Sequence, residues 1–249
     1  MDLFTIHSTS TQKKGWYVQV ANNNKPCMIT QDFVRQLAEI VDKADNTKDL
    51  SHLTLWLPTY FAKRGKISLS GGNLDEMKEL RKNPDEQLAF FQEAKKCFMR
   101  LQQLGCLTSI CFEGSVIGGG VEFAAAFDLR WTTVDGVIWC PQLFNGLSSG
   151  FGGETWLAQK FGRGFAEFLL YAGKQCLPHD LPPHFYADAT AQSHGELENL
   201  VAKHLKKFDS SSAKGFQWQK QSLSKPMDVP SEVLQNQAYA AFLEKWAQR

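Results

Sequence analysis

The stretch CFEGSVIGGGVEFAAAFDLRW, residues 111–131, combines three consecutive glycines, one carboxylate and a run of small apolar residues. A helix built only for stability would not begin this way, because glycine costs roughly 1 kcal/mol per residue relative to alanine in a helix interior. Glycines between a strand and a helix let ligand atoms approach N–H groups that nothing else satisfies in the helix's first turn. The N-terminus of a helix also favours an oxygen that becomes negative.

A second glycine pair lies in ISLSGGNLDEM, residues 67–77, again after a strand-like stretch and before a helix-like one. Two such corners can direct two N–H groups at one carbonyl oxygen and form an oxyanion hole, and we predict that Gly72 and Gly119 are these donors. Losing one donor of such a hole typically costs about 3 to 4 kcal/mol of activation free energy. The alternative is that both pairs are merely tight turns where a helix and a strand pack closely.

Glu122 lies within the first turn of the expected helix, where the helix dipole stabilises its ionised form. Burial among Val121, Phe123 and Ala124 would oppose ionisation. An exposed glutamate at this position would be ordinary. A buried glutamate beside an oxyanion hole would be a general acid/base.

The elements that must position these residues follow from the hydrophobic pattern. Residues 30–44 have apolar residues at three- and four-residue spacing and predict an amphipathic helix capped by Thr30. A longer helix is expected at 85–105, ended by Gly105. Strands alternate with helices through the first two thirds, which predicts an α/β layered fold. The expected strands are residues 15–23, 52–58, 107–114 and 136–140.

The segment from Gln175 to Gly195 contains prolines and histidines without a sustained period, and we interpret it as irregular structure. We therefore divide the chain into a core with the active site, residues 1–175, and a helical region, residues 176–249. In that region, residues 195–208 and 230–249 each carry an apolar stripe on a polar background. These stripes need a partner, in the same subunit or in a neighbour.

Composition narrows the class of protein. The 249 residues carry 27 basic and 26 acidic side chains, so no excess of positive charge favours nucleic acid or a membrane surface. The six cysteines are scattered without C-x-x-C spacing, which indicates buried thiols in a reducing compartment. Neither a secretory signal nor an apolar run of roughly 20 residues is recognisable. We expect a cytoplasmic protein.

The segment GSVIGGGVEFAAAFDLRW, residues 114–131, resembles the signature of the crotonase superfamily, the enoyl-CoA hydratase/isomerase family. Three further segments are similar to family segments in the same order, so the resemblance covers most of residues 15–175. They are VQVANNNKPCMITQDFVRQL, GKISLSGGNLDEM and PQLFNGLSSGFGGETWLAQKFG. The resemblance implies a ClpP/crotonase-like fold, with stacked ββα turns that form two roughly perpendicular sheets flanked by helices. It also implies a C-terminal helical trimerisation region, and hence a homotrimer or a hexamer built as a dimer of trimers.

The resemblance further implies an acyl-CoA substrate, with coenzyme A as part of the substrate and no permanently bound cofactor or metal. Gly72 and Gly119 would hold the thioester oxygen, so that an enolate is stabilised while Glu122 moves a proton. Other positions would contact the substrate. The main chain of Leu69, Ser70 and Gly71 would meet the adenine end of coenzyme A. Lys63, Arg64 and Lys66 would lie near its phosphates unless they form only a solvated loop. Gln142 would bind the substrate in the site, and Phe151 would form part of the wall of the acyl pocket.

The chain departs from the family pattern at positions that bear on the reaction. The second glutamate of a hydratase maps onto Gln142, whose neutral amide cannot act as a base but can orient water or bind a polar group. Asp75 replaces a usual lysine, and Ser149 replaces the proline before the G-x-G-G turn. Decarboxylation or hydrolysis of an acyl-CoA or acyl-carrier thioester, or a catalytically inactive thioester-binding homologue, are therefore alternatives. His179, His184 and His194 reach the site only if the 175–195 segment folds over it.

Overall fold

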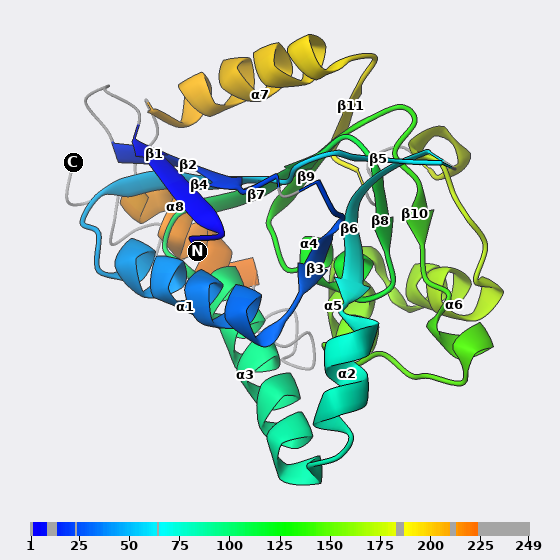
Figure 1. The fold of residues 1–249 in the computed structure, drawn as a ribbon. Helices are drawn as coiled ribbons and strands as arrows, with labels where there is room; N and C mark the ends of the chain where they lie inside the picture. The colour runs from blue at the N-terminus through cyan, green and yellow to red at the C-terminus, as the bar shows by residue number, and fades with distance from the viewer. Residues whose placement is uncertain are drawn as a thin grey trace, which may run out of the picture.

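The structure is a computed structural model that describes residues 2–8, 14–22, 24–63, 65–182, 187–209 and 213–223. In these ranges the chain forms two β-sheets with helices around them (Figure 1). The first sheet has the strand order β1 (Phe4–Ser8), β2 (Lys14–Val20), β4 (Leu50–Trp56), β7 (Leu107–Phe112), β9 (Leu129–Thr133) and β11 (Ala189–Ala191). The second has the order β10 (Ile138–Trp139), β8 (Ser115–Ile117), β6 (Gly65–Gly72) and β3 (Cys27–Ile29), with β5 (Tyr60–Ala62) also paired to β6.

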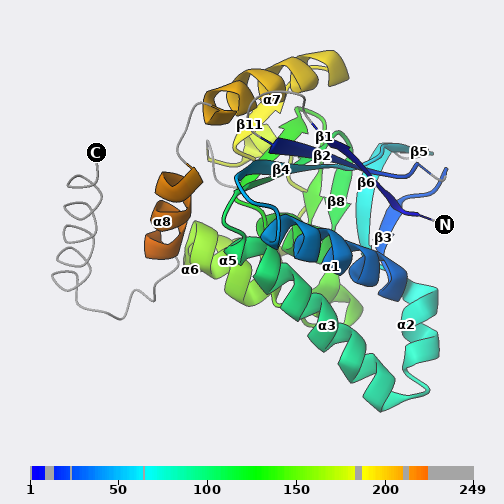
Figure 2. The ribbon, with the colours of Figure 1, turned by 90° about the vertical axis from the view of Figure 1, so that its left-hand side faces the viewer.

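Helices cover both faces of the six-stranded sheet. Figures 1 and 2 show α1 and α3 side by side below this sheet and α7 above it. The described helices are α1 (Gln31–Asp45), α2 (Leu74–Leu80), α3 (Pro84–Gln103), α4 (Gly119–Ala125), α5 (Gly153–Phe161), α6 (Arg163–Ala172), α7 (His194–Asp209) and α8 (Ala213–Leu223), with 3-10 turns η1 (Gln142–Asn145) and η2 (Pro178–Asp180). None of them combines the length and apolar character needed to cross a lipid bilayer.

The core follows from this layering. Strand β7 is buried along its whole length, because successive side chains point to opposite faces and both faces are covered. Ile110 and Phe112 join the large core with α1 and α3, whereas Leu107 and Cys111 pack with the apolar stripe of α7. The partner of the stripe in residues 195–208 is therefore the same subunit. The second predicted stripe, residues 230–249, lies outside the described residues.

The α/β fold with two sheets flanked by helices is confirmed, together with its local signals. The hydroxyl of Thr30 accepts a hydrogen bond from the Phe33 N–H at 3.0 Å and caps α1 as predicted. Helix α3 ends at Gln103, two residues before the expected end at Gly105. These elements depend mainly on local sequence, which is why the pattern predicts them well.

The prediction of irregular structure across 175–195 is wrong at residues 189–191. These residues form β11, which pairs in parallel with β9 and completes the edge of the six-stranded sheet, with Ala189 opposite Trp131. A three-residue strand is too short to show a period of two. Its conformation is imposed by hydrogen bonds to a strand almost 60 positions earlier in the chain.

Candidate active site

Two strand-to-helix corners lie at the same edge of the second sheet. Strand β6 ends at Gly72 and is followed by α2, while β8 ends at Ile117 and is followed by α4. Because β6 and β8 are parallel neighbours, their carboxyl ends meet, and a Cβ added to Gly71 would lie only 2.9 Å from the Gly119 nitrogen. The structure thus brings together the two glycine segments that the sequence analysis paired.

The glycines at these corners have different physical reasons. Gly71 has a φ of +82° and Gly118 a φ of +56°, conformations that side-chain-bearing residues rarely adopt. A Cβ on Gly120 would lie 2.8 Å from the Leu69 carbonyl oxygen, so close packing of α4 on β6 requires glycine there. Tight packing therefore explains part of the glycine run. Gly119 is the first residue of α4, so its N–H has no intrahelical acceptor.

Glu122 is buried in α4, with only 1% of its surface exposed. Its Oε1 accepts a hydrogen bond from Gln142 Nε2 at 2.8 Å. Its Oε2 accepts three more, from Ser149 Oγ at 2.6 Å, the Phe151 N–H at 2.9 Å and the Gly153 N–H at 3.0 Å. Burial raises the pKa of Glu122 above its ordinary value, and these four hydrogen bonds to the ionised form oppose the rise.

The loop of residues 149–153 is shaped to surround this carboxylate. Gly152 precedes α5 with a φ of +85°, and Gly153 begins the helix. A Cβ on Gly153 would lie 2.3 Å from Glu122 Cγ, so only glycine lets this N–H approach the carboxylate. The loop is fixed further by Trp156, whose Nε1–H donates to the Phe151 carbonyl at 2.8 Å. The glycines of this segment therefore allow the loop to pack against the glutamate and donate hydrogen bonds to it.

The other end of α4 is held by two basic side chains, the buried Arg130 and the half-buried Lys160. The Phe127 carbonyl just beyond the helix accepts hydrogen bonds from Arg130 Nη1 at 2.8 Å and from Lys160 Nζ. Cations near the C-terminal end of a helix are favourable because they compensate the negative end of its dipole. Arg130 also pairs with Asp188 at 2.6 Å, which connects this end of α4 to the residues just before β11. Burial lowers the pKa of Lys160 to about 7.

Phe151 lies between the glycine corners and the aromatic core. Its side chain is 4% exposed, and a Cβ on Gly119 would lie 2.6 Å from its ring. The ring also comes within 3.8 Å of the corresponding Cβ position on Gly72. Behind it the ring packs on three phenylalanines of α3, Phe90, Phe91 and Phe98. This one residue therefore lies beside both predicted oxyanion-hole glycines, and its N–H donates to the predicted base.

Gln142 lies in η1, and its side chain reaches Glu122 directly. Because a carboxylate only accepts hydrogen bonds, the amide presents its nitrogen to Glu122. Its other end, Oε1, is buried and has no hydrogen-bond partner among the described residues. The site therefore holds one carboxylate in contact with one neutral amide.

The remaining predicted residues lie in several places. Leu69 is fully buried in the middle of β6, between β3 and β8, and Ser70 follows it at a half-buried position. Lys66 forms an ion pair with Asp135 at 3.0 Å, whereas Lys63 is exposed. Asp75 pairs with Lys78 on the surface of α2. Arg64 and His184 lie outside the described residues.

Of the three histidines that the sequence analysis considered, the structure describes His179 and His194, and both have partners away from Glu122. His194 Nδ1 lies 2.5 Å from Glu113 and its Nε2 3.2 Å from Glu198, at the start of α7. His179 is exposed in η2 and lies beside Asp180. Neither contact connects a histidine to the glutamate or to the glycine corners. Within the described ranges, no cluster of three or more histidine, cysteine or acidic side chains is arranged to hold a metal ion.

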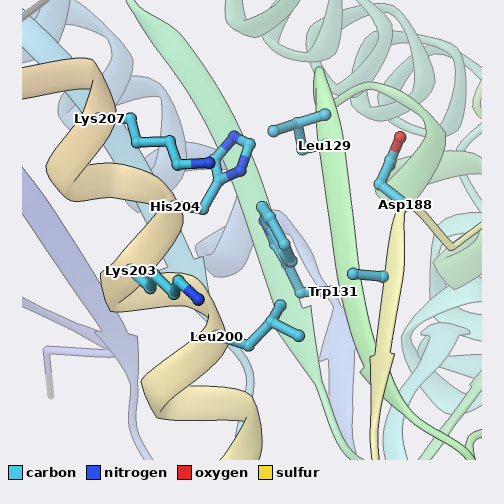
Figure 3. Close-up of a pocket in the computed structure, with 8 residues that line it drawn as sticks. Leu129, Trp131, Asp188, Leu200, Lys203, His204 and Lys207 are labelled. Atoms are coloured by element: carbon cyan, nitrogen blue, oxygen red, sulfur yellow. The ribbon is translucent and has the colours of Figure 1, made fainter.

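A hollow of about 400 Å³ lies between α7 and strands β9 and β11 (Figure 3). It is lined by Leu129, Trp131, Asp188, Ala189, Leu200, Lys203, His204 and Lys207. None of the predicted site residues is among them. The hollow is therefore separate from the site around Glu122.

Comparison with known proteins agrees with the fold. A sequence model of the enoyl-CoA hydratase/isomerase family matches residues 19–248. The chain belongs to this family. The fold of an enoyl-CoA hydratase from Thermoplasma volcanium is similar, with a TM-score of 0.82 over 98% of this chain and 92% of that one at 20% sequence identity.

Curated relatives of this enoyl-CoA hydratase/isomerase family member match over shorter stretches. A short-chain-enoyl-CoA hydratase of Clostridium acetobutylicum is 24% identical over 68% of this chain and 63% of its own length. The fatty acid oxidation complex subunit alpha of Pseudomonas savastanoi is 29% identical over 46% of this chain and 16% of its own length. The matched region thus spans less than two thirds of either relative.

Sequence reasoning missed two contributors to the site of this family member. Ser149 was noted only as a replacement for proline, and Gly153 only as part of a family segment. Both bind Glu122, 27 and 31 positions away in the chain. The available signal was the polar residue at a position where the resembled segment has proline.

Proposed function

We propose that this chain is an acyl-thioester enzyme in which the N–H groups of Gly72 and Gly119 hold the thioester carbonyl oxygen. In this reaction Glu122 transfers a proton at the α-carbon or at a neighbouring carbon. Negative charge then develops on the thioester oxygen, where two fixed donors stabilise it more in the transition state than in the ground state. The observation that carries the proposal is the buried Glu122 beside the two adjoining glycine corners.

The environment of Glu122 supports a role as the base. Burial raises its pKa toward the pH at which the enzyme would work, and a general acid/base is most effective when its pKa lies near the operating pH. Its Oε1 carries one hydrogen bond and has a further lone pair that can take a proton. Proton transfer by one carboxylate fits this arrangement.

Gln142 limits which reactions of the family we propose. By the sequence resemblance it maps onto the second family glutamate, and its Nε2 donates a hydrogen bond to Glu122 at 2.8 Å. A neutral amide cannot remove a proton from water, so we propose chemistry with a single base rather than hydration by two carboxylates. In this role Gln142 orients Glu122 and offers Oε1 to a polar group of the substrate.

Family membership and sequence support the proposals on the substrate carrier, the assembly and the location. We propose an acyl-CoA substrate, with coenzyme A entering as part of it, no permanent cofactor and a place in fatty acid metabolism. We propose a homotrimer or a hexamer, because residues 230–249 carry an apolar stripe that needs a partner. A cytoplasmic location is supported by six free cysteines, five of them buried.

A second candidate function is a thioester-binding homologue without turnover. The saturation of Glu122 Oε2 by three protein donors favours it, because an oxygen so occupied is unavailable to a substrate. The two candidates differ in whether a bound thioester exchanges its α-hydrogen.

The deciding experiment measures hydrogen–deuterium exchange at the α-carbon of a panel of acyl- and enoyl-CoA thioesters by mass spectrometry. Wild type and Glu122→Gln are compared, because this substitution removes the base and keeps the size of the side chain. We expect exchange that falls by at least about 100-fold in the variant. Binding of the thioesters without exchange by the wild type would refute the proposed reaction and support the non-catalytic candidate.

A further inference from the structure

The two oxygens of Glu122 are not equivalent. Oε2 accepts from a hydroxyl and from the Phe151 and Gly153 N–H groups, and the two main-chain groups can only donate. A proton placed on Oε2 would therefore face donor hydrogens. Among the described residues, Oε1 accepts a hydrogen bond only from the amide of Gln142, which can rotate to present its oxygen instead.

Ser149 fixes this asymmetry through its hydroxyl and its main-chain N–H. Its hydroxyl oxygen accepts a hydrogen bond from the Gly153 N–H at 2.6 Å, which leaves the hydroxyl hydrogen free to be donated to Glu122 at 2.6 Å. Its own N–H donates to Glu154 Oε1 at 3.2 Å. The side chain and the main chain of Ser149 are thus both anchored, so the hydroxyl is aimed at Oε2 before any substrate binds.

We propose that Ser149 is a positioning residue whose hydroxyl holds Oε2 of Glu122 and leaves Oε1 as the oxygen that exchanges protons with the substrate. The inference rests on the proposed function, in which Glu122 is the base. Proline, which is usual at this place in the resembled segment, has neither a hydroxyl nor an N–H. This chain therefore orients its glutamate by a contact that proline does not offer.

Two other titratable groups lie near the carboxylate. Cys140 is buried, and burial together with the neighbouring Glu122 raises the pKa of its thiol, so it stays neutral over the range of the test. Glu154 is exposed on the first turn of α5 and contacts Ser149 through its main chain. Neither group donates a hydrogen bond to Glu122, so the contact to Ser149 can be tested separately.

The experiment compares wild type with Ser149→Ala and with the hydroxyl-retaining control Ser149→Thr. The pKa of Glu122 is measured from the ¹³C signal of its carboxyl carbon, with Glu122→Gln to assign the signal. The rate of α-exchange on saturating thioester is measured across pH in the same proteins. Loss of one charge-assisted hydrogen bond corresponds to an upward shift of roughly one pH unit in both measurements, and Ser149→Thr should return both to the wild-type position.

At pH values above the pKa of Glu122 the rate of α-exchange reaches a plateau, and the height of this plateau reports which oxygen reacts. We expect a plateau reduced by roughly tenfold in Ser149→Ala, because the released carboxylate spends less time in the reactive orientation, with an unchanged dissociation constant for the thioester. A raised plateau would show that Oε2 is the reacting oxygen and would overturn the inference. The inference would also be overturned if Ser149→Ala and the wild type had the same pH profile and the same carboxyl titration. If no protein exchanges hydrogen, the proposed function fails and the claim about Oε1 fails with it, whereas the carboxyl titration still decides whether Ser149 holds Glu122.

Discussion

Gly153→Ala tests whether the 149–153 loop is built around Glu122. The added Cβ would lie 2.3 Å from Glu122 Cγ, whereas carbon atoms in contact are separated by about 3.5 to 4.0 Å, so the glutamate or the loop must move by more than about 1 Å. Overpacking of this kind costs roughly 1 to 3 kcal/mol, and the Gly153 N–H would lose its bond to the carboxylate, which adds roughly 1.5 to 3 kcal/mol. The higher helix propensity of alanine returns up to about 1 kcal/mol.

We therefore expect the free energy of unfolding to fall by roughly 1.5 to 5 kcal/mol, which is roughly 3 to 20 °C in melting temperature for a chain of this length. A base displaced by about 1 Å loses on the order of 100-fold in rate. Both are measured on one preparation, by thermal unfolding followed by circular dichroism and by α-exchange on a CoA thioester.

Gly164→Ala in α6 is the matched control, because a Cβ there meets nothing within 4 Å. It should leave exchange within about twofold and keep or slightly raise the melting temperature. The reasoning would be refuted if Gly153→Ala melted and exchanged like this control, since the loop would then accommodate a side chain against Glu122.

Three further predictions follow from other parts of the structure. The pKa of Glu122 is raised in the folded state, so wild-type stability falls as pH rises from about 4.3, the pKa in the unfolded state, through the folded-state pKa. The melting temperature of Glu122→Gln should therefore rise relative to that of the wild type across this range of pH. The same dependence of melting temperature on pH in both proteins would contradict this. Phe151→Ala should cost about 3 to 5 kcal/mol of unfolding free energy and increase exchange of longer acyl thioesters relative to short ones, and an unchanged chain-length preference would remove Phe151 from the acyl-pocket wall. Because the pKa of Lys160 is lowered to about 7, the unfolded state binds more protons than the folded state between that pH and about 10.4. The stability of the wild type relative to Lys160→Met should therefore rise between pH 7 and pH 9. An equal change of melting temperature with pH in the two proteins would show that folding does not lower the pKa of this amine.

Much of the fold was predictable from sequence because its signals are local. The cap at Thr30 and the apolar face of α1 lie within one element. The two glycine corners are each contained in a few consecutive residues between a strand and a helix. Local backbone preference and hydrophobic periodicity encode such features. Strand β11 escaped prediction because its three residues are ordered by pairing with β9.

The sequence by itself determined that a carboxylate follows a glycine corner and that an amide stands where a second carboxylate was expected. Only the tertiary structure decided that Ser149, Phe151 and Gly153 hold one oxygen of Glu122 while Gln142 holds the other. These partners lie 20 to 31 positions away in the chain. Hydrogen bonds of about 3 Å depend on how α4, η1 and α5 pack, and spacing along the sequence does not encode that packing.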